Sequence, residues 1–230
     1  MIDVIYLKNI SVKNIIKNLT MSISSKKLIT IFGKSGIGKS TLLKVISNNV
    51  EYEGEIFFNN KNICELKPNY YRAMVNYLPQ EPVLFGQTPY DNFSMLKNLK
   101  IHKNLSFTDD KICRYLEELQ LPKGILNKSI ASLSGGEKQR IALVRSILIN
   151  PKFILLDEPT SALDVFSEEV IFNFLKKLSE NIGIVIVSHS KNIIMNSDIK
   201  ILLMKNGYKI FESDFDENFI YQTIKEENEK

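Results

Sequence analysis

The sequence predicts an α/β protein built around a mixed β-sheet. Two apolar runs, Lys152–Asp157 and Gly183–His189, lack the alternation of a half-exposed strand. Such continuous runs are typical of parallel strands buried on both faces. Helical patterns lie between the apolar runs, and this order indicates βαβ units. In addition, the strand pattern Lys27–Gly33 runs into a glycine-rich loop that is followed by a helical pattern.

The N-terminal part is expected to form short strands joined by turns. Ile2–Leu7 and Leu19–Ser24 are short and rich in β-forming residues. Asn59 and Asn60 stand between two apolar runs, as in a hairpin or another tight turn.

The middle of the chain, from about Asp91 to Ile149, is expected to be mostly helical. Asp109–Leu121 places apolar side chains along one helical stripe, and Gly135–Ile149 has the same periodicity. The residues of the first stripe are Ile112, Tyr115, Leu116 and Leu119.

Strand patterns return after this segment and continue toward the C-terminus. The pair Asn206-Gly207 lies between two of them and predicts a hairpin. We find no internal repeat or low-complexity linker, so residues 1–230 are expected to form a single domain. Within it, 1–90 and 150–230 would form the α/β core, and about 91–149 a helical insertion.

Composition and charge restrict the possible partners. The chain has 230 residues, of which 44% are hydrophobic and 24% charged, as in ordinary globular proteins. A net charge of +4 is too small to indicate nucleic acid. No run approaches the roughly 18 apolar residues of a membrane span, and the first residues do not resemble a signal peptide. Cys64 and Cys113 lack paired spacing and are expected to be free thiols.

The segment "GKSGIGKST" follows the phosphate-binding pattern G-x-x-x-x-G-K-[ST]. Its glycines let successive backbone N–H groups face one anion, and the following helix adds its positive end. Lys39 would reach the β- and γ-phosphates, and the Ser40 hydroxyl would ligate Mg²⁺. The alternative is a structural glycine turn. The predicted nucleotide-binding residues are Gly33, Lys34, Ser35, Gly36, Ile37, Gly38, Lys39, Ser40 and Thr41.

Two carboxylates follow the buried strand that begins at Phe153. Asp157 ends this strand, and open α/β sheets bind ligands at the carboxyl ends of their strands. Asp157 is therefore expected to hold Mg²⁺ through water. Glu158 can polarise an attacking water, although it could instead cap the next turn. Gln80 and His189 are uninformative alone and become candidate active-site residues only in combination with these two carboxylates.

The segment "LSGGEKQR" contains a second glycine-rich helix start. Ser134 and Glu137 match the S-x-x-E capping box. The cap does not require Gly135 and Gly136, each of which costs about 1 kcal/mol inside a helix relative to alanine. Bare N–H groups at a helix start bind phosphate, although a plain helix start is the alternative. Because this helix belongs to the helical insertion, separate from the core that carries the glycine loop, we expect it not to serve the chain's own nucleotide.

Taken in order, these motifs resemble those of the nucleotide-binding subunits of ABC transporters. The similarity covers nearly the whole chain, and "LSGGEKQR" followed by "LLDEPTSALD" is highly specific. The resemblance implies a P-loop NTPase (RecA-like) core with a mixed sheet, an N-terminal antiparallel β-subdomain and an inserted α-helical signature subdomain. The matching segments are Gly33–Thr41, Gln80, Leu133–Gln139, Phe153–Glu158, Ser161–Asp164 and His189.

The resemblance also implies ATP and Mg²⁺ as cofactors and a head-to-tail dimer that forms with ATP. The signature segment of one copy, with Ser134, Gly135 and Gly136, would close on the ATP of the other copy. Asp164 would lie at the subunit contact. The implied catalytic residues are Glu158, His189, Gln80 and Lys39, and the implied metal site contains Ser40, Gln80 and Asp157.

Two features of the resemblance leave alternatives open. The family usually stacks adenine on an aromatic residue before the glycine loop, and none occurs between Tyr6 and Phe32. Either Tyr6 serves or aliphatic contacts hold the base. Val83, Leu84 and Phe85 would line a groove for a permease helix or belong to the core.

The sequence therefore predicts an ATP-hydrolysing subunit on the cytoplasmic face of a membrane, where it is peripheral and drives a separate integral membrane permease. A finer resemblance of Leu66–Asn92 and Leu121–Arg140 to a bacterial subgroup of iron or metal exporters favours export of a metal ion or small solute. The alternative is a non-transport ABC ATPase acting on DNA or ribosomes, but no nucleic-acid partner is expected.

Overall fold

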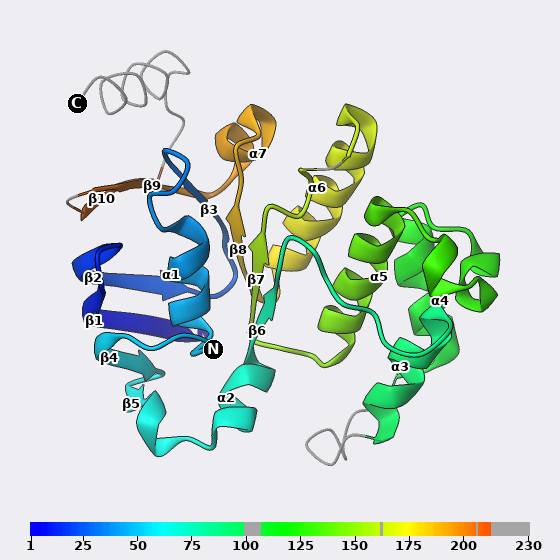
Figure 1. Ribbon diagram of the computed structural model, residues 1–230, viewed down its shortest axis with the longest axis horizontal. Coiled ribbons are helices and arrows are strands. Elements are labelled where there is room, and N and C mark those ends of the chain that lie inside the picture. Colours follow the sequence, from blue (N-terminus) through cyan, green and yellow to red (C-terminus); the bar gives the residue numbers. More distant parts are fainter. Residues whose placement is uncertain (99–106, 162, 206, 213–230) are drawn as a thin grey trace.

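The computed structural model describes residues 1–98, 107–161, 163–205 and 207–212. These residues form two β-sheets with helices packed around them (Figure 1). One sheet has four strands in the order β2-β1-β4-β5, and the other has six in the order β10-β9-β3-β8-β7-β6. The predicted α/β class with a mixed sheet and an antiparallel β part is confirmed.

The four-stranded sheet is antiparallel throughout. Asn59 and Asn60 join its last two strands with φ angles of 50° and 64°. Positive φ at both central residues is what a two-residue hairpin turn requires, so of the two predicted alternatives the hairpin is the one found. The strands are β1 (Val4–Val12), β2 (Ile16–Ser24), β4 (Glu53–Phe58) and β5 (Lys61–Asn62).

The six-stranded sheet is mixed. Only β10, the last strand in the sequence, runs antiparallel to its neighbour, and it forms a hairpin with β9 that pairs Gly207 with Met204. Strands β3, β7 and β8 are buried along their whole length, as the continuous apolar runs predicted for β7 and β8. The strands are β3 (Leu28–Phe32), β6 (Val75–Leu78), β7 (Phe153–Asp157), β8 (Gly183–Val187), β9 (Ile199–Met204) and β10 (Gly207–Phe211).

The described part of 91–149 contains three α-helices and two short 3-10 helices. The first of the α-helices begins slightly earlier, at Pro89. Ile112, Leu116 and Leu119 of the predicted stripe are fully buried. Residues 99–106 lie outside the described part, and the subdomain boundaries remain a prediction. The helices are α1 (Lys39–Ile46), η1 (Ile63–Glu65), α2 (Pro68–Met74), α3 (Pro89–Asn98), α4 (Asp109–Glu118), η3 (Lys123–Asn127), η4 (Ile130–Ser132), α5 (Gly135–Leu148), α6 (Val165–Ser179) and α7 (Lys191–Asn196).

The six-stranded sheet has a hydrophobic core on each face. Successive side chains of a strand point to opposite faces, so β7 contributes to both cores. Phe153 and Leu155 pack with α1 and the four-stranded sheet, whereas Ile154 and Leu156 pack with α5 and α6. Figure 1 shows this layering, with α1 beside β1 and β2 on one side of the sheet and α5 and α6 on the other.

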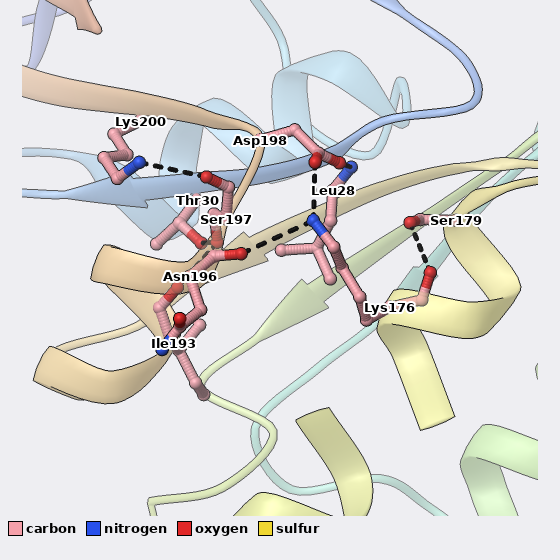
Figure 2. A network of polar contacts seen from close by, with 9 residues as sticks. All are labelled: Leu28, Thr30, Lys176, Ser179, Ile193, Asn196, Ser197, Asp198 and Lys200. Carbon is pink, nitrogen blue, oxygen red and sulfur yellow. Dashed lines mark hydrogen bonds and ion pairs between the residues drawn. The ribbon is translucent and has the colours of Figure 1, made fainter. Parts of the chain in front are cut away.

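A polar network anchors the amino-terminal ends of β3 and β9 (Figure 2). Asp198 accepts a hydrogen bond from the Leu28 amide at 2.7 Å and pairs with Lys176 of α6 at 2.5 Å. The hydroxyls of Thr30 and Ser197 are hydrogen-bonded to each other. These contacts fix α6 against the sheet at the edge opposite to the glycine loop.

Within the described ranges, no helix is long and apolar enough to cross a membrane. Cys64 and Cys113 are free thiols, as the sequence predicted.

Candidate active site

The glycine-rich loop connects β3 to α1. Gly36 and Gly38 have φ angles of 78° and 107°, which are strained for any residue with a side chain. The loop ends at Gly38, the N-cap of α1, which supplies no side-chain acceptor to the first helical N–H groups. These amides therefore remain available to an anion, and the positive end of the helix favours one.

Lys39 lies over this loop and is only 6% exposed. Its ammonium donates to the carbonyl oxygens of Gly33 and Lys34 at 3.0 and 3.1 Å. Burial lowers the pKa of Lys39, and the nearby charges of Glu158 and Asp157 oppose that shift. A phosphate oxygen is a stronger acceptor for an ammonium than a carbonyl, so a nucleotide can replace these two bonds.

Asp157 lies at the end of β7, and both of its carboxylate oxygens accept hydrogen bonds. Oδ1 accepts from the Ser40 hydroxyl at 2.9 Å, and Oδ2 accepts from the Tyr77 hydroxyl at 3.0 Å. No group of three or more His, Cys, Asp or Glu side chains in the described residues could hold a metal. A hydroxyl beside one carboxylate fits Mg²⁺, which takes one or two protein oxygens and completes its shell with water and phosphates.

Glu158 adopts a left-handed backbone conformation, with φ at 47°. Such a conformation costs about 1–3 kcal/mol in a residue other than glycine, and such strain clusters at functional sites. Its carboxylate lies 3.3 Å from the Gln80 side-chain amide and 3.7 Å from Nε2 of His189. The next turn is closed by Ser161, whose hydroxyl donates to the Glu158 carbonyl. These side-chain contacts differ from those of a carboxylate that caps a turn.

Parallel pairing explains why these distant residues meet. Strands β3, β8, β7 and β6 run in the same direction, so their carboxyl ends lie at one edge of the sheet. Gln80 follows β6, Glu158 follows β7 and His189 follows β8. The structure thus brings all three predicted residues together.

Gln139 is a member of this site that we did not single out from the sequence. It comes from α5 and is only 5% exposed. Its side-chain amide donates to the backbone carbonyls of Gln80 and Glu158 at 3.2 and 3.4 Å. The signal in the sequence is a polar residue on the buried face of an apolar helix.

The signature segment begins α5 with the predicted capping box. The Ser134 hydroxyl accepts from the Glu137 amide at 3.1 Å, and the Glu137 carboxylate accepts from the Ser134 amide at 2.8 Å. A Cβ atom at Gly136 would lie 2.6 Å from Cδ2 of Leu163, whereas one at Gly135 would meet nothing within 4 Å. Gly136 thus lies against the end of the Leu163 side chain, whereas no neighbour accounts for the exposed Gly135.

Asp164 has a role within its own chain. It is the N-cap of α6, and its carboxylate accepts from the backbone amide and the hydroxyl of Ser167, both at 2.9 Å. These bonds to Ser167, the backbone amide first, lower the pKa of Asp164. Its predicted place at a subunit contact remains a prediction.

Tyr6, the aromatic candidate from the sequence, lies far from the glycine loop, and the structure places an aliphatic residue, Ile15, beside that loop. The Tyr6 ring packs beside Phe57, with centroids 6.1 Å apart. Because a strand rises about 3.3 Å per residue, Tyr6 is roughly 20 Å from the end of β1. Ile15, in the turn between β1 and β2, is exposed, and its Cγ2 would lie 2.6 Å from a Cβ at Gly38.

The segment of Val83 to Phe85 is partly exposed. Val83 and Phe85 are 65% and 50% exposed, whereas Leu84 packs against the core. Arg145 of α5 donates to the Val83 carbonyl at 2.9 Å and lies 5.2 Å from the centre of the Phe85 ring. The segment borders a groove between β6, α3 and α5, lined by residues that include Tyr77, Phe85, Asn92, Met95 and Arg145.

Comparison with known proteins decides the family. Residues 16–161, more than half of the chain, match the family described as ABC transporter. The chain belongs to the ABC transporter family. It is an ABC-type ATPase subunit that binds and hydrolyses ATP, in agreement with the loop and carboxylate geometry described above.

Several ABC proteins are similar over most of this chain. The "Probable iron export ATP-binding protein FetA" of Escherichia coli is 37% identical, and the similarity covers 88% of this chain and 90% of that protein. The "Phosphate import ATP-binding protein PstB" of Thermotoga maritima is 37% identical, and the similarity covers 76% of this chain and 74% of that protein. The chain spans only 36% of a Rickettsia prowazekii protein named for both ATP-binding and permease functions.

A solved structure agrees with this ABC fold. It is a dimeric post-hydrolysis state of an ATP-binding cassette with ADP and phosphate bound. It is 26% identical, with a TM-score of 0.77, and the similarity covers 90% of this chain and 98% of that one.

Proposed function

We propose that this ABC ATPase works on the cytoplasmic face of a membrane, bound peripherally to a separate permease, and powers export of a metal ion or small solute. The observation that carries the hydrolytic part is the gathering of Glu158, Gln80 and His189 beside Asp157. FetA, which is named for iron export, supports the cargo class, and this chain covers nearly all of FetA's length. The permease would therefore be a different chain.

Each residue of the site has a chemical task. The loop amides and Lys39 bind the phosphates, and Ser40 and Asp157, with Gln80, would hold Mg²⁺. When bound, Mg²⁺ would supply positive charge against the charge that develops on the phosphates. Glu158 accepts the proton of the attacking water, and His189 orients that water beside the γ-phosphate.

We infer that the site is completed by a second copy of the chain. Gly135 is exposed at the positive end of α5 and has no packing requirement for the lack of a side chain. An anion there would be bound by bare N–H groups together with Ser134 and Gly136. The dimeric state of the related cassette supports a head-to-tail pair, in which Asp164 would also lie at the contact.

We also propose that aliphatic contact holds the base. Ile15 is exposed and lies against the glycine loop, whereas Tyr6 lies far along β1. An isoleucine presents an apolar face but no ring, so it contributes burial without stacking. Recognition of ATP would then depend mainly on its phosphates.

The proposed docking site for the permease is the groove beside Val83 and Phe85. Val83 and Phe85 expose apolar surface next to a groove. Clustered apolar surface of this kind marks an interaction site, whereas single exposed apolar side chains are ordinary. Gln80 lies in the same loop, so movement of the groove would reach Glu158 through Gln80.

The substitution Glu158→Gln tests the hydrolytic assignment. The variant should bind ATP, release no phosphate and accumulate as an ATP-bound dimer in sedimentation. Glu81→Gln, which changes an exposed carboxylate next to Gln80, is the matched control and should turn over normally. Wild-type turnover of Glu158→Gln would refute the assignment, and stimulation of the ATPase by DNA or RNA would contradict a permease as the partner.

A further inference from the structure

We propose that Tyr77 is a positioning residue for the magnesium ligand, and that its hydroxyl holds the Asp157 carboxylate in the orientation that binds Mg²⁺ with the nucleotide. This inference rests on the proposed role of Asp157 in holding Mg²⁺, which we expect to occur through water. The Tyr77 hydroxyl donates to Oδ2 of Asp157 at 3.0 Å, across 80 residues of sequence.

The sheet geometry places the phenol of Tyr77 beside Asp157. Strand β6 pairs in parallel with β7, and Tyr77 is the partner of Leu155. Cross-strand partners and residues two apart on one strand share a face, so Tyr77, Leu155 and Asp157 point to the same side. Leu155 packs in the core that includes α1, and Ser40 reaches Asp157 from α1.

Two donors hold the carboxylate from both sides. Ser40 donates to Oδ1 and Tyr77 donates to Oδ2. The terminal torsion of an aspartate is broad, so a carboxylate held at one oxygen can rotate. A metal ligand needs its orientation fixed within about 10–20°, and outer hydrogen bonds usually provide that restraint.

The side chain of Tyr77 makes two separate contributions, a hydroxyl that donates to Asp157 and an aromatic ring. The ring packs against the core beside α1. A purely structural role would reside in that ring, and removal of the hydroxyl alone separates the two roles.

The experiment compares Tyr77→Phe with the matched control Tyr71→Phe in the full chain. Tyr71 is also buried, but its hydroxyl donates to the Ile46 carbonyl at 2.6 Å and is not bonded to Asp157. ATP affinity is measured by calorimetry in EDTA and then over a range of Mg²⁺ concentrations. Mn²⁺ binding in the presence of ADP is followed by electron paramagnetic resonance.

We expect Tyr77→Phe to bind ATP like the wild type in EDTA but to need about tenfold more Mg²⁺, since loss of an outer-shell partner costs about 10–100-fold in metal affinity. Its Mn²⁺ affinity should fall in parallel, whereas Tyr71→Phe should change only thermal stability. A wild-type Mg²⁺ requirement in Tyr77→Phe, or an equal loss of ATP affinity in EDTA, would overturn the proposal.

A third variant distinguishes this failure from failure of the proposed metal site. Asp157→Asn should raise the Mg²⁺ requirement at least as much as Tyr77→Phe. If Asp157→Asn has a strong effect and Tyr77→Phe has none, only the positioning role is wrong. If Asp157→Asn has no effect, the assignment of Asp157 as ligand is wrong, and the role of Tyr77 is wrong with it.

Discussion

The substitution Gly135→Asp separates the two possible reasons for a glycine at the start of α5. A Cβ atom at Gly135 meets nothing within 4 Å, so the fold has room for the new side chain. A carboxylate in the first turn of a helix stabilises it by about 0.3–1 kcal/mol. We therefore expect the isolated chain to unfold at the same temperature as the wild type or slightly higher.

The expected cost appears only when a phosphate approaches this helix start. At roughly 5 Å and an effective dielectric constant near 20, two unit charges repel by about 3 kcal/mol. Each 1.4 kcal/mol is a factor of about ten, so closure of the ATP-bound dimer should weaken by about 100-fold or more. The control Gly135→Ala adds a side chain without charge and should close almost normally.

Three measurements on both Gly135 variants check this reasoning. ATP binding to the single chain is measured by calorimetry, dimer formation by sedimentation and turnover by phosphate release. Gly135→Asp should retain the first and lose the other two. Normal turnover in Gly135→Asp, or an equal loss of ATP binding by the single chain, would refute a role across the dimer.

Three further perturbations follow from particular contacts. Gly136→Ala should change the free energy of unfolding by no more than about 1 kcal/mol, because the new methyl meets only the movable end of the Leu163 side chain at 2.6 Å and alanine favours a helix by about 1 kcal/mol over glycine; a loss of several kcal/mol in urea unfolding would contradict this. Burial raises the pKa of Asp198, but hydrogen bonds from Leu28 and Lys176 lower it overall. The resulting stability is complete well above the unfolded value of 3.8 and is lost as the pH falls through the folded pKa. Asp198→Asn should therefore remove about 1–2 kcal/mol at pH 7 and flatten the acid limb of urea unfolding between about pH 5 and pH 2. An unchanged limb would count against the assignment. Ile15→Tyr should raise the affinity for ATP about three- to tenfold in calorimetry, since stacking adds about 0.5–1.5 kcal/mol, and should leave the affinity for tripolyphosphate unchanged. An equal change in affinity for both ligands would exclude contact between residue 15 and the base.

Sequence reasoning succeeded where the physical cause is local. The apolar runs of β7 and β8 are continuous because both faces of these strands are buried. Asn59 and Asn60 tolerate positive φ, so their hairpin could be predicted from two residues. The capping box of Ser134 is likewise a contact within one turn.

Other parts of the site depend on the register between distant segments. Strand β6 has only four residues and mixes polar with apolar side chains, so its pattern is weak until it pairs with β7. The bond from Tyr77 to Asp157 and the bonds from Gln139 to two carbonyls arise only from that packing. The proximity of Leu163 to Gly136 is also invisible in sequence, because it brings together the start of α5 and the segment before α6.

Mixing two inactive variants tests most directly whether each ATP site is shared between two copies. Lys39→Ala lacks a phosphate-binding lysine but has an intact signature, and Gly135→Asp has the reverse. Each variant alone should release almost no phosphate. A mixed dimer contains one site with both halves intact, so mixing should restore phosphate release at an intermediate rate that rises with protein concentration. A mixture as inactive as its parts would contradict the shared site.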